Sequence, residues 1–286
     1  MKQFIGLLLA VISTACGSET NKKTTEVPSE QKTEKEQPDT AINTMGDGLF
    51  LGYTNEPGDI VLLLDSDSIQ QPKLIKNALS ATGVVLHVAF TGTKKAKDQD
   101  NGRQNYFNFS NSGGHRFEVE KGTLPNDQTI VLCTDAFLKE HQVLQFDSKT
   151  KGNLANEVRS KIEQDKGRIV KRSAVIATVK EKVRIALVEF EMKGNQALVV
   201  LAVITPTEIS YKDFPAEYDE TSTWGVDDGG DFGFEWFTVN AIFENKGSFE
   251  IVTDWAGAEG TAIEYLKEEN GELVTVKKAY RYTAPL

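Results

Sequence analysis

Cysteine is scarce in this chain, with Cys16 and Cys133 the two among 286 residues. A modified Cys16 would leave Cys133 without a partner in the chain, which excludes a fold stapled by disulfides. Cys133 ends the apolar run 130–132, so we expect a buried core thiol there rather than a reactive nucleophile. Histidine occurs three times, at positions far apart in the sequence, which argues against a zinc site built from closely spaced ligands.

Long apolar runs are lacking as well. The two most apolar stretches are residues 4–12, interrupted by Gly6, and residues 197–204. Both are shorter than the ~20 residues that a helix needs to cross a bilayer core. The chain also contains no Gly-rich phosphate-binding loop and no G-x-S-x-G nucleophile elbow. The sequence therefore identifies no catalytic residue.

Basic residues are outnumbered, with 32 Lys and Arg against 42 Asp and Glu, for a formal charge of −10 at pH 7. Without residues 1–15, which contain Lys2 and no acid, 31 basic residues face 42 acidic ones, and the charge is −11. Nucleic-acid binding draws its affinity from Lys and Arg against phosphates, so we expect no nucleic-acid partner. The same balance argues against adsorption to anionic lipid, so a membrane location would need an anchor.

The N-terminus reads MKQFIGLLLAVISTAC, with a basic start at Lys2, an apolar centre, and Ser13, Thr14 and Ala15 before Cys16. This order predicts a secretory signal peptide over residues 1–15. The Cys directly after small residues resembles the lipobox of bacterial lipoproteins, although Ser13 stands where that pattern usually has Leu. The resemblance implies that the Cys16 thiol receives a diacylglyceryl group, that the chain is cut before it, and that the new amine is acylated, as with palmitate. The alternative is an ordinary signal peptide cut near Ala15, which leaves Cys16 a free thiol.

Residues 16–45 form a second distinct segment, with no aromatic side chain and few apolar ones. Such a composition cannot bury enough apolar surface to offset the entropy of ordering, so we expect a disordered tether with a reach of about 30 Å. A folded domain on such a tether is the usual layout of a lipoprotein, which favours the lipid anchor over plain secretion. By the same resemblance, Gly17 in place of the Asp that retains enteric lipoproteins at the inner membrane favours the outer membrane.

Residues 46–286 are expected to fold as one α+β unit, with a possible sub-boundary near residue 150. Short apolar runs separated by turn residues predict strands at 49–51, 60–64 and 84–90. An apolar stripe after Pro72 predicts a short helix over 72–79, which would make a parallel strand–helix–strand unit. A second helix is predicted over 153–166, capped by Asn153 and ended by Gly167. After Gly167 the pattern predicts an antiparallel sheet of about seven strands, with residues 197–204 covered on both faces.

The most unusual chemistry lies in residues 206–233, which we interpret as one long connection between strands. It carries eight acidic residues against Lys212 alone, −7 in 28 residues. Aromatic residues are also concentrated between 211 and 237, eight of the 25 in the chain. Connections of this length without secondary structure tend to be functional or disordered, and aromatic residues that can anchor the loop argue against disorder.

Three hypotheses compete for this stretch. Asp227, Asp228 and Asp231 could wrap a Ca²⁺ ion, although their spacing is not that of an EF-hand, so the cofactor expectation is none or Ca²⁺. Alternatively, aromatic side chains beside carboxylates could line a groove for a sugar or a peptide; the candidates are Tyr218, Trp224 and Trp236. Two of the acids within 213–231 could then act as a glycosidase pair. The third possibility is structural, with aromatics that pin the loop and acids that are solvated.

The sequence thus predicts an exported bacterial lipoprotein with a lipid anchor in a membrane of the cell envelope. The preferred function is a non-catalytic binding or structural module whose partner is an envelope polysaccharide or protein. The alternative is an envelope hydrolase acting on glycan or peptide through carboxylates of the 213–231 region.

Overall fold

The computed structural model describes residues 48–80, 82–126, 128–148, 152–180 and 182–284. The described residues all belong to one compact unit. The predicted signal peptide, the lipidation site Cys16 and the tether over 16–45 lie outside the described residues. None of the described helices is long and apolar enough to cross a membrane.

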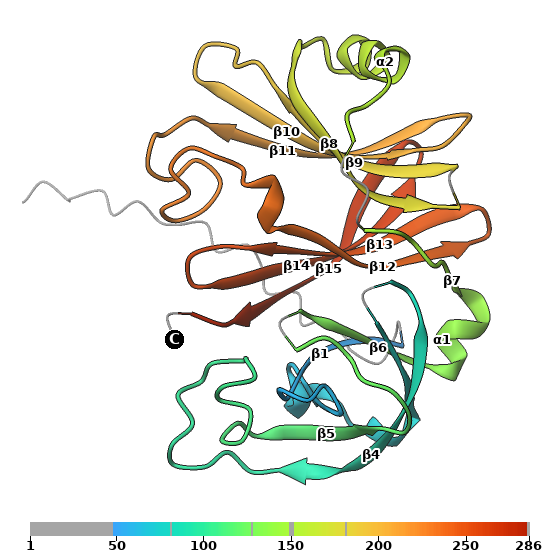
Figure 1. The fold of residues 1–286 in the computed structure, drawn as a ribbon, viewed down its shortest axis with the longest axis vertical. Coiled ribbons are helices and arrows are strands. Elements are labelled where there is room, and N and C mark those ends of the chain that lie inside the picture. The colour runs from blue at the N-terminus through green and yellow to red at the C-terminus, as the bar shows by residue number, and fades with distance from the viewer. Residues whose placement is uncertain (1–47, 81, 127, 149–151, 181, 285–286) are drawn as a thin grey trace, which may run out of the picture. The chain divides into compact units, whose positions relative to one another are not determined.

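The first half of the unit is a closed six-stranded barrel (Figure 1). Its strands follow the order β1-β2-β5-β4-β3-β6, and every neighbouring pair is antiparallel. The barrel interior is filled by aliphatic and aromatic side chains such as Phe50, Val61, Leu132 and the fully buried Phe117. The elements are β1 (Leu49–Thr54), β2 (Ile60–Leu63), η1 (Ser66–Ser68), η2 (Pro72–Leu74), β3 (Ile75–Leu79), β4 (Val85–Lys94), β5 (Gly114–Val119) and β6 (Ile130–Thr134).

The helix predicted over 72–79 is wrong. The chain makes one 3₁₀ turn, η2, and then continues as β3, which pairs with β4 on one side and with β6 on the other. Both pairings are antiparallel, so the expected parallel unit is absent from this part of the described chain. The apolar spacing suits either structure over so few residues, and closure of the barrel through two ladders decides for the strand.

The second half is a nine-stranded sheet in the order β7-β12-β13-β14-β15-β11-β10-β9-β8. A short helix leads from the barrel into it, and a longer helix precedes β8. The elements are α1 (Asp135–Glu140), β7 (Gln142–Val143), α2 (Asn156–Lys166), β8 (Val170–Val179), β9 (Val183–Phe190), β10 (Gln196–Ile204), β11 (Ile209–Glu217), η3 (Phe234–Trp236), β12 (Phe237–Asn245), β13 (Ser248–Ala256), β14 (Gly260–Glu269) and β15 (Glu272–Tyr282). All neighbouring strands are antiparallel except β11 and β15, which pair in parallel with Tyr211 opposite Glu272.

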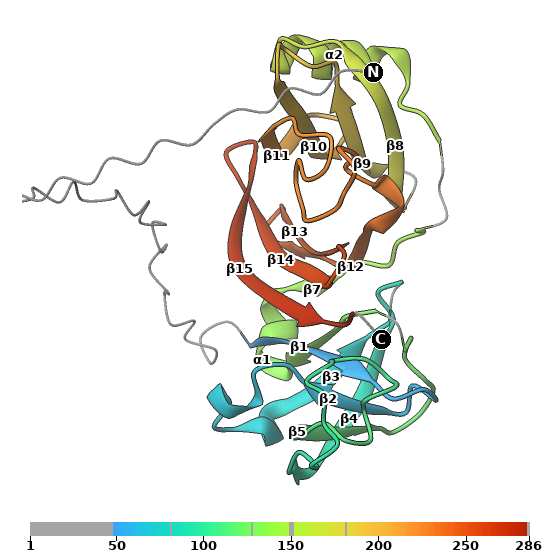
Figure 2. The ribbon, with the colours of Figure 1, turned by 90° about the vertical axis from the view of Figure 1, so that its left-hand side faces the viewer.

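The nine-stranded sheet folds over itself, so that β8–β11 and β12–β15 form two halves around a shared core (Figure 2). Leu187 and Leu201 from one half meet Ile251 and Leu266 from the other in this core. The outer face of β8–β11 is covered by α2, whose Ile162 is completely buried. In β10, alternate residues therefore enter different cores, which confirms the prediction that residues 197–204 are covered on both faces.

The helix α2 confirms the second predicted helix but begins later than predicted. Ala155 rather than Asn153 occupies the N-cap position, and no side chain caps the helix there. Gly167 ends it as predicted, in the left-handed conformation with φ 58°. The fold class is therefore α+β and mainly β, with an antiparallel second half, as the sequence predicts.

The barrel and the second sheet share a third core. Leu51 and Tyr53 of β1 pack with Phe243 of β12, Val252 of β13 and Tyr265 of β14. The chain passes from barrel to sheet through α1, between β6 and β7. The layers of the unit are thus α2, the β8–β11 half, the β12–β15 half and the barrel, with a buried core between successive layers.

Candidate functional site

The stretch that we predicted as one long connection is a strand followed by a loop. Residues 209–217 form β11, which pairs with β10 along its whole length, so the prediction of an unpaired connection from 206 is wrong for this part. The remainder, which we name the β11–β12 loop, spans residues 218–236 and ends in the 3₁₀ turn η3. Figures 1 and 2 both show this orange segment between the two halves of the sheet. The acidic and aromatic residues of the stretch are thus divided between the strand β11 and the loop that follows it.

Asp228 holds the β11–β12 loop in shape. Its carboxylate accepts hydrogen bonds from the backbone N–H groups of Thr223 at 2.9 Å, Trp224 at 2.6 Å, Gly225 at 2.8 Å and Gly230 at 2.9 Å. Burial alone would raise the pKa of Asp228, but these four donors outweigh it and hold the pKa below its ordinary value. A carboxylate fixed in its ionised form is unsuited to donate a proton at neutral pH, which weighs against Asp228 as the acid of a glycosidase pair.

Aromatic side chains attach the loop to the core between the two halves of the sheet. The indole Nε1 of Trp224 donates a hydrogen bond to the carbonyl oxygen of Phe214 at 3.1 Å, and its ring meets that of Phe232 edge-on at 5.4 Å. Phe232 is 1% exposed and stacks on Trp255 with ring centroids 4.2 Å apart. Trp224 therefore serves as an internal anchor of the loop, and its ring is partly buried.

Tyr218 and Trp236, the other two predicted ligand-binding residues, are exposed. Their exposed fractions are 42% and 60%. The backbone N–H of Tyr218 is fixed by the carbonyl of Asn195 at 2.7 Å, and its ring lies against Gly230, where a Cβ atom would come within 2.8 Å of the ring. The structure thus separates the three predicted aromatic residues into one anchor and two accessible rings.

The three aspartates predicted to bind Ca²⁺ have different surroundings. Asp228 is committed to backbone N–H groups, and Asp231 forms an ion pair with Arg172 of β8. Asp227 is exposed, and its carboxylate accepts no hydrogen bond from the described residues. Among the residues that the structure describes, no group of three or more His, Cys, Asp or Glu side chains is placed to hold a metal ion.

Basic side chains that the sequence analysis missed neutralise part of the acidic stretch. The guanidinium of Arg172 pairs with Glu189 and Asp231 and lies 4.3 Å above the ring of Phe234. The ammonium of Lys166 repeats the arrangement, 2.5 Å from Asp213 and 4.3 Å from the ring centre of Tyr211. Both cations come from more than 40 residues earlier in the chain, as the separations of 59 and 47 residues show, so no local sequence pattern could have indicated them.

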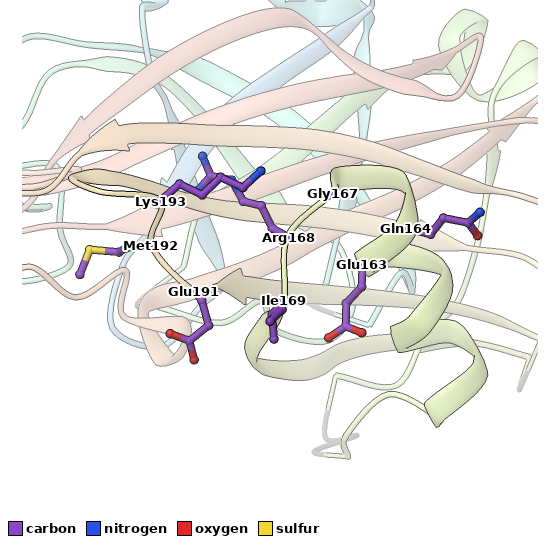
Figure 3. Close-up of a pocket in the computed structure, with 8 residues that line it drawn as sticks. All are labelled: Glu163, Gln164, Gly167, Arg168, Ile169, Glu191, Met192 and Lys193. Carbon is purple, nitrogen blue, oxygen red and sulfur yellow. The ribbon is translucent and has the colours of Figure 1, made fainter.

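A shallow groove of about 540 Å³ lies between the last turn of α2 and the β9–β10 turn (Figure 3). Its apolar lining comes from Ile169 and Met192, which are 67% and 52% exposed. In Figure 3, Arg168 and Lys193 lie close together, and the carboxylates of Glu163 and Glu191 lie on either side of Ile169. The groove carries both signs of charge and contains no predicted site residue.

A buried polar network on the barrel side of the sheet was also missed. The Nδ1 atom of His141 lies 2.7 Å from a carboxylate oxygen of Glu250, and the hydroxyl of Tyr265 donates to the same oxygen. His141 also stacks on Phe137 of α1 with ring centroids 3.9 Å apart. These contacts fix α1 to the sheet, and we assign the network to structure because its side chains are buried between the barrel and the sheet.

Cys133 is fully buried, and burial raises the pKa of its thiol, which confirms the prediction of a core thiol.

Comparisons of the chain with protein-family models, with curated proteins and with solved structures found no match. Any functional conclusion therefore rests on the geometry of the site and on the order of residues 1–16.

Proposed function

We propose that this chain is a bacterial lipoprotein of the cell envelope whose β11–β12 loop binds an envelope component without catalysis. The support for its location is the order of residues 1–16, with Cys16 as the acylated residue and the outer membrane as the favoured site. The tether over 16–45 would let the folded unit reach partners at a distance from the lipid.

The observation that carries the binding proposal is a fixed loop with exposed aromatic rings. Asp228 and Trp224 hold the loop from within, while Tyr218 and Trp236 face solvent. A rigid loop loses little entropy when a ligand docks, and aromatic rings supply most of the contact energy in many recognition sites. The envelope component is a polysaccharide or a protein.

Retention on immobilised envelope material tests this proposal. The Tyr218→Ala and Trp236→Ala variants should each lose about tenfold in retention, since loss of one aromatic contact with the ligand costs about 1.4 kcal/mol. Met192→Ala serves as the control, because Met192 is a similarly exposed apolar residue outside the loop. Equal retention of all three variants and the native chain would refute a role for the loop.

The lipid anchor has its own measurement. Mass spectrometry of the mature protein from the membrane fraction should show Cys16 as the first residue, carrying acyl groups. A soluble mature protein with an unmodified Cys16 would contradict the proposal and favour the ordinary signal peptide.

A Ca²⁺ ion at Asp227, Asp228 and Asp231 is the weaker hypothesis for the loop. Asp228 and Asp231 already have partners in the fold, so a bound ion would have to replace them. A ligand that binds only the folded state raises the unfolding midpoint, so a thermal melt with Ca²⁺ and with chelator decides the question. Identical midpoints would remove Ca²⁺ from the description of this loop.

A further inference from the structure

Three large apolar side chains are exposed on the β11–β12 loop. Tyr218, Val226 and Trp236 have 42%, 67% and 60% of their surface accessible. The loop beneath them is held by Asp228 and by the buried Phe232. These side chains are thus presented on a fixed base, which is the arrangement expected of a docking surface rather than of a mobile loop tip.

The charge next to these side chains is negative and is not neutralised within the fold. Three exposed carboxylates accompany them, Glu220, Asp227 and Glu235, and none has an ion pair with a described residue. Other acids of the stretch do have such partners, as Asp213 does with Lys166 and Asp231 with Arg172. The loop that exposes these rings therefore also carries negative charge without an ion pair in the described chain.

The fold itself shows what this combination of groups binds. At Arg172 and at Lys166, a cation lies 4.3 Å from an aromatic ring while it pairs with a carboxylate. Along the loop, Glu235 directly precedes the exposed Trp236, and Glu220 follows the exposed Tyr218 by two residues; among the described residues none of these four side chains has an ion pair or a cation over its ring. A ring face attracts a cation, the carboxylate adds charge pairing, and the alkyl stem of Lys or Arg covers the ring.

We propose that the exposed face of the β11–β12 loop docks a Lys- and Arg-rich segment of a partner protein. The inference rests on the proposed binding function and specifies the chemistry of the partner. Charge complementarity selects this occupant, because the same loop exposes aromatic and aliphatic side chains and carboxylates without ion pairs in the described chain. An anionic glycan would meet these carboxylates as like charges and is disfavoured.

The test measures binding of a short peptide of alternating Lys and Ser to the full chain carrying Cys16→Ser, which keeps it unacylated. The double variant Glu220→Gln, Asp227→Asn should weaken binding about tenfold, and so should Trp236→Ala, because each removes one to two kcal/mol of contact. Binding to the unaltered loop should also fall as salt is raised, since exposed charges are screened. A peptide of alternating Glu and Ser should not bind.

Glu208→Gln is the control for net charge, with one carboxylate removed where the double variant removes two. Glu208 is exposed, carries the same charge and lies before β11, at the strand end opposite the loop. Equal weakening by Glu208→Gln would show attraction to net negative charge alone and would overturn the proposal. An unchanged peptide affinity in the Trp236→Ala variant would also overturn the proposal.

The failure of this inference can be told apart from failure of the binding function. If retention on envelope material depends on Trp236 but not on Glu220, Asp227 or salt, the loop binds and the cationic partner is wrong. If neither measurement depends on Trp236, both proposals are wrong.

Discussion

Asp228 uses both of its carboxylate oxygens on the backbone of its own loop. One oxygen accepts from Thr223 and Gly230, and the other from Trp224 and Gly225. From the sequence, Asp228 was predicted as a possible metal ligand because it stands in a run of aspartates. Its local role depends on where four N–H groups point, which only the folded loop fixes.

We expect Asp228→Asn to destabilise the protein by about 1–2 kcal/mol, because an amide offers one oxygen where the carboxylate offers two. The free energy of unfolding in urea measures the effect. Asp227→Asn is the control, since it makes the same change at a neighbour with no described side-chain partner and keeps a residue that tolerates the observed φ of 56°. A loss at Asp227 as large as at Asp228 would contradict this account of the loop.

Asp254 of β13 shows the opposite electrostatic situation. It is 5% exposed and accepts a hydrogen bond from the backbone N–H of Thr129 at 3.1 Å, between sheet and barrel. Burial raises the pKa of Asp254, and the hydrogen bonds and the charge of Arg281 offset this in part. The folded state thus holds a proton on this group more tightly than the unfolded state does.

The sign of the pH dependence follows from that raised pKa. The contribution of Asp254 to stability is fully present below the unfolded pKa of about 3.9 and is lost as pH rises through the folded value. We expect Asp254→Asn to remove this contribution, so that the stability difference between variant and native chain changes with pH in the acid range. Parallel urea midpoints for the two proteins across that range would contradict the assignment.

At the scale of elements, local sequence patterns predicted the secondary structure correctly where an element is long or is ended by a characteristic residue. The helix α2 and the β10 strand were predicted, because one has a stripe and a terminal glycine and the other is apolar throughout. The region 72–79 was wrong, since eight residues cannot distinguish a helix from a strand by periodicity. The strand β11 was missed because its inner and outer residues are mostly polar or aromatic, as in Lys212 and Asp213.

The end of α2 allows a direct test of a local signal. Gly167 has φ 58°, and a Cβ atom there would meet no heavy atom within 4 Å, so the cost of a side chain is that of the backbone alone. We expect Gly167→Ala to lower the free energy of unfolding by about 1 kcal/mol. Gly225→Ala is the control, because Gly225 also has open space around it but no positive φ, and its unfolding free energy should not change. Equal effects at the two sites would contradict the backbone explanation.

At the scale of the whole molecule, the barrel and the second sheet share one buried core. Phe243 of the sheet is completely buried there, beside Phe137 of α1 and Leu51 of the barrel. A core shared in this way couples the stability of both parts, because neither part can unfold without exposing the apolar surface of the other.

We therefore expect barrel and sheet to unfold together. All three Trp residues lie in the second half of the chain, so their fluorescence reports the sheet, and Cys133 reports the barrel through thiol labelling in a Cys16→Ser background. The two probes should give one urea midpoint. Phe243→Ala should lower the free energy of unfolding reported by both probes by about 3–5 kcal/mol. Ile169→Ala, at an exposed position, should shift neither. Two separate midpoints would show that the shared core does not couple the parts.

The sequence by itself determined the fold class, most strand positions, the C-terminal end of α2 and the burial of Cys133, since each depends on local apolar pattern or on single turn residues. It also located the acidic and aromatic stretch, because composition needs no contacts. Only the tertiary structure decided that 72–79 closes a barrel and that Trp224 is an anchor while Tyr218 and Trp236 are accessible. It also decided which acids are paired, through Arg172 and Lys166. The physical reason is that ladder pairing, burial and ion pairing join residues far apart in the chain, and a local pattern carries no information about such partners.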